Sequence, residues 1–168
     1  AWRVGSEQVL IHRRQRTPSP KAETETFSNP PEAGAVRLVS MVRVLLVDDH
    51  AIVREGFKRL FENTEGYEVL AEASTVADAV AAARTHSPDI AVLDLSLSAG
   101  NSGLTLLGQL AAVVPDVRRV VLSMHDDPGL VLRALDLGAH GYVTKAAAVD
   151  ELVGVLDRVM QGEVVLSS

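Results

Sequence analysis

Five short apolar segments alternate with amphipathic segments along most of the chain. The first of them, at 42–47, is nearly continuous and rich in β-branched residues, which is typical of a strand buried on both faces of a parallel sheet. The predicted strands cover residues 42–47, 67–73, 89–94, 118–123 and 140–144. Helical spacing and start and stop signals predict helices at about 51–63, 76–86, 104–114, 127–137 and 149–161.

A strand followed by a helix occurs five times in this order. Such a repeat implies right-handed crossovers between parallel strands. The expected fold class is therefore α/β, with a five-stranded parallel sheet and helices on both faces. Thr75 and Asp78 have the spacing of a capping box, and Gly138 and Gly162 are typical helix stops. In sheets of this kind, ligands bind at the carboxyl ends of the strands.

Residues 1–40 differ in composition from the rest of the chain. Four of the seven prolines lie here, and residues 17–35 are rich in Pro, Ser, Thr and Glu with little to bury. We predict a disordered or non-native tail at 1–40 and one domain at 41–168, with Met41 directly before the first strand. A basic cluster at 12–16 could contact nucleic acid or belong to a solvated linker, and we favour the linker.

Charge is distributed unevenly along the chain, whose net charge is -6. Residues 1–40 hold six Lys and Arg against four Asp and Glu, whereas the remainder holds ten against eighteen. A domain this acidic is a poor candidate for binding nucleic-acid backbones by itself. The absence of Cys excludes disulfides and Cys-based sites and agrees with a cytoplasmic location. No apolar run is long enough to span a membrane, and we expect no signal peptide because the N-terminal stretch lacks an apolar h-region.

Polar residues that could bind ions or take part in a reaction lie at the ends of the predicted strands. They are, in chain order, Asp48, Asp49, Asp94, Ser123 and Lys145. A parallel topology would gather them at one edge of the sheet. Two carboxylates about 4 Å apart repel by roughly 4 kcal/mol at an effective dielectric of about 20. A cation between them would relieve this repulsion, and all-oxygen ligands favour Mg2+.

A metal ion beside a carboxylate suggests phosphoryl transfer to that carboxylate. Asp is a known nucleophile for phosphoryl groups, and the charge on the transferring oxygens must be neutralised in the transition state. Mg2+ would do so on one side and the Lys145 ammonium on the other, while the Ser123 hydroxyl could donate to a third oxygen. Each residue also has an ordinary structural alternative, such as a helix cap, a turn, a strand end or an exposed lysine.

The histidines do not predict a zinc site, because no pair has metal-ligand spacing. His50 and His125 are expected in loops near the acidic cluster, whereas His86 and His140 are expected at structural or surface positions. Tyr142 in the fifth strand is either a half-buried aromatic residue or part of a switch.

Four segments together resemble the signature of response-regulator receiver domains of two-component systems. They read VLLVDDH at 44–50, VLDL at 92–95, VLS at 121–123 and GAHGYVTK at 138–145. The DDH start and the GEVVLS ending resemble the NarL/FixJ subfamily of transcriptional regulators. The resemblance covers about residues 42–168 and implies the flavodoxin-like (βα)5 receiver fold.

The resemblance implies a role for each residue of the acidic cluster. Asp94 would accept the phosphoryl group and bind Mg2+ directly, together with Asp49 and the backbone carbonyl of Ser96. Asp48 would act on the ion through water, and Lys145 would contact the phosphoryl group. A partner sensor histidine kinase would supply this group from its own phosphohistidine.

The resemblance also implies an output. Ser123 and Tyr142 would form a coupled switch toward the surface of the predicted fourth helix and fifth strand. This surface would control transcription through a helix-turn-helix DNA-binding domain in a longer parent protein, and phosphorylation could produce a homodimer. The chain ends at Ser168, where the linker to that domain would begin, so we expect no nucleic-acid or membrane binding by this chain alone.

Two features depart from the receiver pattern. Ala146 follows the lysine, where many receivers have a proline after a cis bond. A cis bond before alanine costs about 2.5–4 kcal/mol, so the sequence leaves this isomer open. The loop at 95–103 lacks the usual proline and is one residue too long for the pattern, which puts its geometry near the metal in question.

Two other functions stay open as alternatives. A metal-dependent phosphoesterase would also use an acidic cluster, but it normally needs further His and Asp ligands for two metals. A pseudo-receiver, an interaction module without phosphorylation, would not need the complete set of polar residues. A Rossmann nucleotide-binding unit is excluded because no Gly-rich loop follows the first strand. We therefore expect a phosphoacceptor signalling domain that is not an enzyme acting on other molecules.

Overall fold

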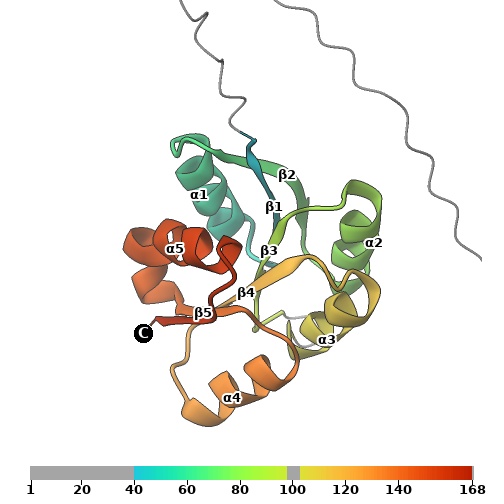
Figure 1. Ribbon diagram of the computed structural model, residues 1–168, viewed down its shortest axis with the longest axis vertical. Helices are drawn as coiled ribbons and strands as arrows, with labels where there is room; N and C mark the ends of the chain where they lie inside the picture. The colour runs from blue at the N-terminus through green and yellow to red at the C-terminus, as the bar shows by residue number, and fades with distance from the viewer. Residues whose placement is uncertain (1–39, 98–102, 168) are drawn as a thin grey trace, which may run out of the picture. The chain divides into compact units, whose positions relative to one another are not determined.

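The computed structural model describes residues 40–97 and 103–167, which form a parallel sheet of six strands covered by helices (Figure 1). The strand order is β2-β1-β3-β4-β5-β6. The strands are β1 (Val42–Val47), β2 (Tyr67–Ala73), β3 (Ile90–Asp94), β4 (Arg118–Ser123), β5 (Gly141–Thr144) and β6 (Val165–Ser167). The helices are α1 (Ala51–Glu62), α2 (Val76–His86), α3 (Gly103–Val113), α4 (Pro128–Asp136) and α5 (Lys145–Met160).

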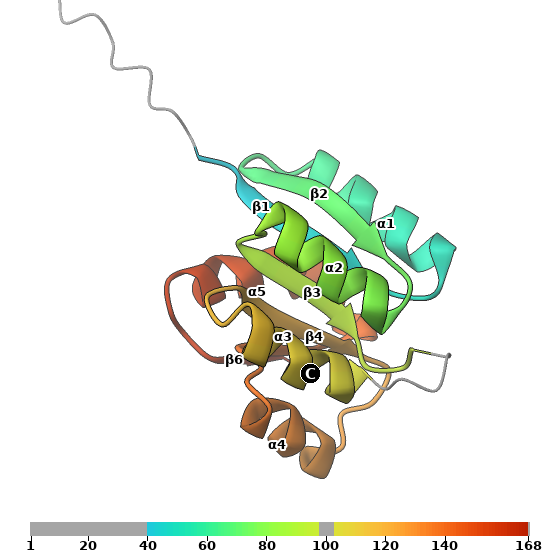
Figure 2. The same ribbon diagram turned by 90° about the vertical axis from the view of Figure 1, so that its right-hand side faces the viewer.

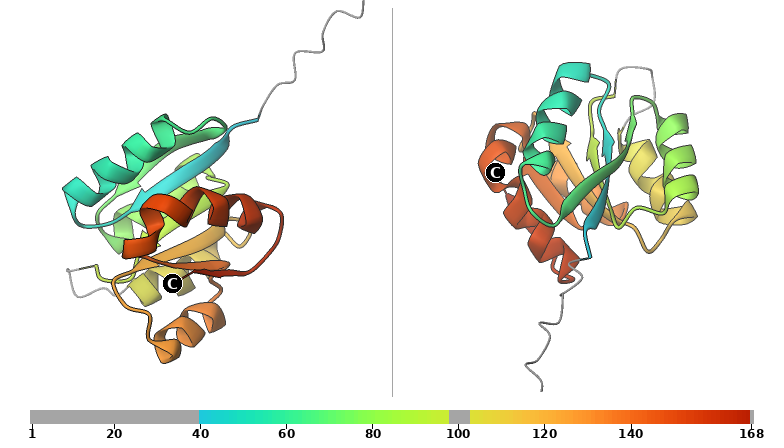
Figure 3. Two further views of the ribbon diagram at one scale, coloured as in Figure 1. Left: turned by 90° about the vertical axis from the view of Figure 1, so that its left-hand side faces the viewer. Right: turned by 90° about the horizontal axis from the view of Figure 1, so that it is seen from above.

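Helices cover both faces of the sheet (Figure 2 and Figure 3). α1 and α5 lie on one face, whereas α2, α3 and α4 lie on the other. Alternate residues of each strand supply the two cores: Val44 and Leu46 pack with residues of α1 and α5, and Leu45 and Val47 pack with residues of α2 and α3. Because both faces are covered, a strand stays apolar until it ends, which is why continuous apolar runs predicted the strands.

Most boundaries agree with the prediction from the sequence. The strands at 42–47, 67–73 and 118–123 are confirmed with the expected bounds, and the first four helices agree within one residue. Thr75 caps α2, since its Oγ1 accepts a hydrogen bond from the amide of Asp78 at 3.1 Å. The predicted tail and most of the loop after Asp94 lie outside the described residues, so both stay predictions.

The predicted α/β fold with a parallel sheet is confirmed, but at the C-terminal end one helix boundary was misplaced and the sheet has a short additional strand. α5 begins at Lys145, four residues before the expected start, because Thr144 Oγ1 accepts a hydrogen bond from the amide of Ala147 and the alanines there favour a helix. The sheet has six strands instead of five, because β6 pairs in parallel with β5 and places Val165 opposite Gly141. β6 has only three residues, which is too short for a recognisable alternation.

A buried arginine and a histidine organise the amino ends of β4 and β5. Arg119 is 5% exposed, and its guanidinium donates to the backbone carbonyls of Val117 and Gly138, each at 2.8 Å. The Arg119 amide donates to Nδ1 of His140 at 3.1 Å, which requires an unprotonated nitrogen. Burial, together with the charges of Arg119 and Arg118, lowers the pKa of His140 to about 4.

We expect the domain to lose stability as the pH falls below about 6.5, the pKa of an unfolded histidine. His140 contributes fully above that value, and its contribution is lost as the pH falls through its folded-state pKa of about 4. After allowance for partial exposure, the loss is about 1–2 kcal/mol. Urea unfolding across this pH range measures it. His140→Asn keeps an acceptor that cannot titrate and should flatten the dependence, whereas an unchanged dependence in this variant would contradict the assignment.

Candidate functional site

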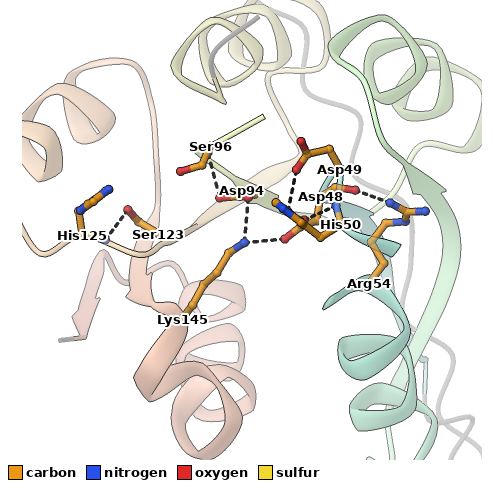
Figure 4. A network of polar contacts seen from close by, with 9 residues as sticks. All are labelled: Asp48, Asp49, His50, Arg54, Asp94, Ser96, Ser123, His125 and Lys145. Carbon is orange, nitrogen blue, oxygen red and sulfur yellow. Dashed lines mark hydrogen bonds and ion pairs between the residues drawn. The ribbon is translucent and has the colours of Figure 1, made fainter. Parts of the chain in front are cut away.

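The polar residues that the sequence predicted at the carboxyl edge of the sheet do lie together there (Figure 4). They come from the ends of β1, β3, β4 and β5, which are consecutive neighbours in the sheet. Because all four strands run in the same direction, side chains up to 97 positions apart in the sequence are in direct contact. The residues at this edge are Asp48, Asp49, Asp94, Ser123 and Lys145.

Lys145 links two carboxylates. Its Nζ donates to Oδ2 of Asp48 at 2.7 Å and to Oδ2 of Asp94 at 2.8 Å. Both carboxylates are buried, Asp94 completely. Burial by itself lowers the pKa of Lys145, but its hydrogen bonds and ion pairs with Asp48 and Asp94 outweigh burial, so the pKa is raised. The lysine therefore stays charged and holds the ends of β1 and β3 together.

The other carboxylate oxygens face backbone amides and an imidazole ring. Oδ1 of Asp94 accepts from the amide of Ser96 at 2.9 Å. Oδ1 of Asp48 accepts from the amide of His50 at 2.8 Å. The His50 Nδ1 atom lies 3.2 Å from that oxygen and 3.0 Å from Oδ1 of Asp49. Ser96 thus lies beside the phosphoacceptor candidate as expected, and the role of its carbonyl stays a prediction.

This cluster has the chemistry of a site for a divalent cation. Ligand atoms of Asp48, Asp49, His50 and Asp94 all lie within 4.8 Å of one another. Lys145 balances one of the three carboxylates, so the cluster keeps an excess of negative charge that a cation would neutralise. Carboxylate oxygens are the ligands that Mg2+ prefers, and the residues present therefore fit this ion.

Ser123 and Tyr142 contact the same residue in the loop between β4 and α4. Ser123 is fully buried, and its Oγ accepts from the amide of His125 at 3.0 Å. Tyr142 is 2% exposed, and its hydroxyl donates to the carbonyl of His125 at 2.7 Å. Burial raises the pKa of Tyr142, so the hydroxyl keeps the proton that it donates. The two residues expected to form a switch are thus joined through one loop residue, and Tyr142 is buried and not half-buried.

Sequence reasoning missed Arg54, and it did not predict that His50 contacts the acidic pair. Nη1 of Arg54, on α1, donates to the backbone carbonyl of Asp48, and its Nε lies 3.6 Å from Oε2 of Glu72. Arg54 therefore ties the acidic segment to α1 and β2. A single arginine on a helix carries no distinctive pattern in a sequence. His50 was expected only as a nearby loop residue, although its place directly after the acidic pair was the available signal.

Gly103, at the start of α3, is a third residue that sequence reasoning did not single out. Its amide donates to the carbonyl of Leu95 at 3.1 Å. A Cβ atom added here would overlap the backbone carbonyl oxygen of Asp94 and the Cα of Leu95. Only glycine lets α3 approach the end of β3 this closely. Any larger residue would have to displace the backbone that carries Asp94.

Gly103→Ala should therefore lower the free energy of unfolding by more than about 2 kcal/mol. The matched control is Gly108→Ala in the same helix, where the added Cβ would lie 3.7 Å from a Leu137 methyl group, in ordinary contact. That variant should be neutral or up to about 1 kcal/mol more stable, since alanine is the better helix former. Urea unfolding compares the two, and equal stabilities would contradict the close approach.

Comparison with known proteins identifies relatives among response regulators. The family model for the response regulator receiver domain matches residues 44–157. The chain is 37% identical over 128 residues to the response regulator UvrY of Escherichia coli strain K12, covering 76% of this chain and 58% of that protein. It is 38% identical over 126 residues to the nitrate/nitrite response regulator protein homolog of Haemophilus influenzae, covering 75% and 60%. The chain thus spans about three fifths of the length of these relatives.

Solved structures show the same fold. A two-component response regulator of the LuxR family from Aurantimonas sp. SI85-9A1 has a TM-score of 0.71 at 38% identity, covering 75% of this chain and 89% of that one. The signal receiver domain of the putative response regulator NarL from Mycobacterium tuberculosis has a TM-score of 0.69 at 31% identity, covering 74% and 99%. The second structure is an isolated receiver domain, and the match covers almost all of it.

The described helices include none long and apolar enough to cross a membrane. The family match spans more than half of the chain, UvrY shares its sequence, and the NarL receiver domain shares both its sequence and its fold. This chain belongs to the response regulator receiver domain family, of the NarL/FixJ type, whose members act as phosphoacceptors in two-component signalling.

Proposed function

We propose that this receiver domain accepts a phosphoryl group from a sensor histidine kinase onto the carboxylate of Asp94, in a reaction that requires Mg2+. The observation that carries the proposal is the cluster in which Lys145 bonds to both Asp94 and Asp48. Asp94 ends β3, which lies between the acidic pair after β1 and Ser123 at the end of β4. Among the three carboxylates, only that of Asp94 lies between the other two carboxylates on one side and the Ser123 hydroxyl on the other.

Each residue supplies a separate part of the reaction. Asp94 supplies the nucleophilic oxygen. Lys145 keeps its charge and can redirect a hydrogen bond from Asp94 to an oxygen of the incoming phosphoryl group. Asp49, Asp94 and the carbonyl of Ser96 would hold Mg2+ directly, and Asp48 would do so through water. When bound, the ion neutralises charge on the transferring oxygens.

Phosphorylation would change the surface beside Tyr142. Ser123 Oγ accepts from the His125 amide, and it can turn to donate to the phosphoryl group, which adds close to two negative charges. That turn would release the loop residue whose carbonyl holds Tyr142. An open pocket of about 390 Å³ borders Tyr142, and its rim includes the exposed side chains of Leu132 on α4 and Leu166 on β6. This apolar surface is the candidate output face.

The names of the relatives indicate which partners a longer parent protein would have. Two are named response regulators, one of them for nitrate and nitrite, and one matching structure is an RcsB response regulator in complex with DNA. We infer a transcriptional output through a DNA-binding domain outside this chain, with homodimerisation as an effect of phosphorylation. The receiver domain itself would bind neither nucleic acid nor membrane, would act in the cytoplasm, and would catalyse only its own phosphorylation and dephosphorylation.

Intact-mass measurement after incubation with acetyl phosphate tests the proposal. One added phosphoryl group that requires Mg2+ and is absent with a chelator would support a receiver. Steady release of inorganic phosphate without an adduct would support a metal-dependent phosphoesterase. The absence of both would support a pseudo-receiver, an interaction module that works without phosphorylation.

We also propose that residues 41–168 form the receiver domain and that residues 1–40 are a tail outside it. The tail composition offers little apolar surface for docking. Deletion of residues 1–40 should therefore leave the free energy of unfolding nearly unchanged. A loss of more than about 2 kcal/mol, the scale of one core truncation, would show that the tail packs on the domain.

A further inference from the structure

The His50 ring faces the same carboxylates as the proposed metal ion, although sequence reasoning gave it no role. Its Nδ1 atom lies 3.0 Å from Oδ1 of Asp49 and 3.2 Å from Oδ1 of Asp48. Figure 4 shows the ring between these two side chains. Nδ1 and one oxygen from each of Asp48, Asp49 and Asp94 lie within 4.8 Å of one another. The candidate ligand set therefore contains one nitrogen besides the three carboxylates.

Lys145 and His50 approach Asp48 from different oxygens. Oδ2 of Asp48 accepts from the Lys145 ammonium, whereas Oδ1 faces the amide and the ring of His50. The ammonium thus contacts Oδ2 of Asp48 and Oδ2 of Asp94. The imidazole lies on the other side, at Oδ1 of Asp48 and Oδ1 of Asp49. A cation bound by the acidic pair would meet the imidazole on that side of the cluster.

The backbone holds His50 in this position. His50 is the N-cap residue of α1 in an extended conformation, and its amide is bonded to Asp48. The side chain is 62% exposed, so the ring can tilt toward an ion without disturbing the core. Without an ion, Nδ1 faces two carboxylate oxygens as an N–H donor. When a cation takes the place of that proton, the neutral ring can carry its proton on Nε2, which leaves a lone pair on Nδ1 for the metal.

We propose that His50 is a metal ligand of this receiver domain and that it shifts the preference of the site from Mg2+ toward transition-metal ions such as Mn2+ and Co2+. The proposal rests on the metal site of the proposed function and adds the residue that sets its selectivity. Mg2+ prefers oxygen ligands and gains little from an imidazole, whereas Mn2+ and Co2+ accept nitrogen and bind mixed sites more tightly in that order. Loss of the ring should therefore weaken transition-metal binding selectively.

Calorimetric titration with Mg2+ and with Co2+ at one fixed pH tests this, using the wild type, His50→Gln and His50→Ala. Both variants should bind Co2+ about tenfold more weakly or worse, the scale seen when a metal site loses supporting groups. Their affinity for Mg2+ should change less than about twofold. His125→Gln is the matched control, because His125 is exposed near the site but lies outside the ligand set, and it should change neither affinity.

Pulsed electron paramagnetic resonance of bound Mn2+ gives a second readout that does not depend on affinity. Wild type and His125→Gln should show modulation from a directly bound imidazole nitrogen, and both His50 variants should lack it. Unchanged nitrogen modulation in the His50 variants, or equal losses of Mg2+ and Co2+ affinity, would overturn the assignment of His50 as a ligand. A wild type that binds no Mg2+ would instead contradict the proposed function.

Discussion

In Lys145→Met, the free energy of unfolding measured with a chelator should fall by about 3–5 kcal/mol. Lys145 Nζ lies 2.7 Å from an oxygen of Asp48 and 2.8 Å from an oxygen of Asp94, and both carboxylates are almost fully buried. Methionine preserves most of the side-chain length but removes the positive charge. The carboxylates would then face each other without the ammonium between them, and the cost would be that of a broken buried ion pair.

Mg2+ should return part of this loss, because a cation at the acidic cluster would offset the same repulsion. The stabilisation by Mg2+ should therefore be larger in Lys145→Met than in the wild type. Lys58→Met is the matched control: Lys58 also forms an ion pair, at 2.9 Å from Glu72, but its side chain is 38% exposed. Its loss should cost far less than the loss of Lys145, because an exposed ion pair is screened by solvent. Urea unfolding followed by circular dichroism compares the variants, and similar losses in both would contradict a buried cluster held by Lys145.

Much of the fold could be predicted because the strands carry local signals. β1 is an apolar run interrupted only by Arg43 and followed by Asp48, and such runs are typical of a sheet covered on both faces. β6 could not be found in this way, because its three residues are ordered by pairing with β5 and not by a pattern of their own. The start of α5 was placed too late because Lys145 was assigned to the end of a strand, although Thr144 caps a helix there.

The composition of the site could be predicted, but not its internal contacts. Parallel strands bring their carboxyl ends to one edge, so the proximity of Asp48, Asp94 and Lys145 follows from topology alone. The choice of oxygen that each partner contacts depends on side-chain geometry. The roles of Arg54 and Gly103 depend on backbone atoms from other elements, which single residue types do not reveal.

Asp94→Asn should abolish phosphorylation and preserve the fold. Asparagine has nearly the size of aspartate but lacks the anionic oxygen that attacks phosphorus. The change also removes one negative charge from a crowded acidic cluster, so stability should change by less than about 2 kcal/mol. Lys145 contacts both Asp94 and Asp48, so the lysine alone does not select the acceptor. On this proposal the selection would come from the central strand, which puts Asp94 between the acidic pair and Ser123.

Peptide mapping of the phosphorylated residue tests this central claim most directly. Wild type, Asp94→Asn and Asp48→Asn are treated with acetyl phosphate, with Mg2+ or with a chelator, and the acyl phosphate is trapped by borohydride before digestion. The account predicts that the wild type carries the modification at Asp94 only when Mg2+ is present, and that Asp94→Asn carries none. A modification at Asp48 or Asp49 in the wild type, undiminished labelling of Asp94→Asn, or full labelling without Mg2+ would contradict it.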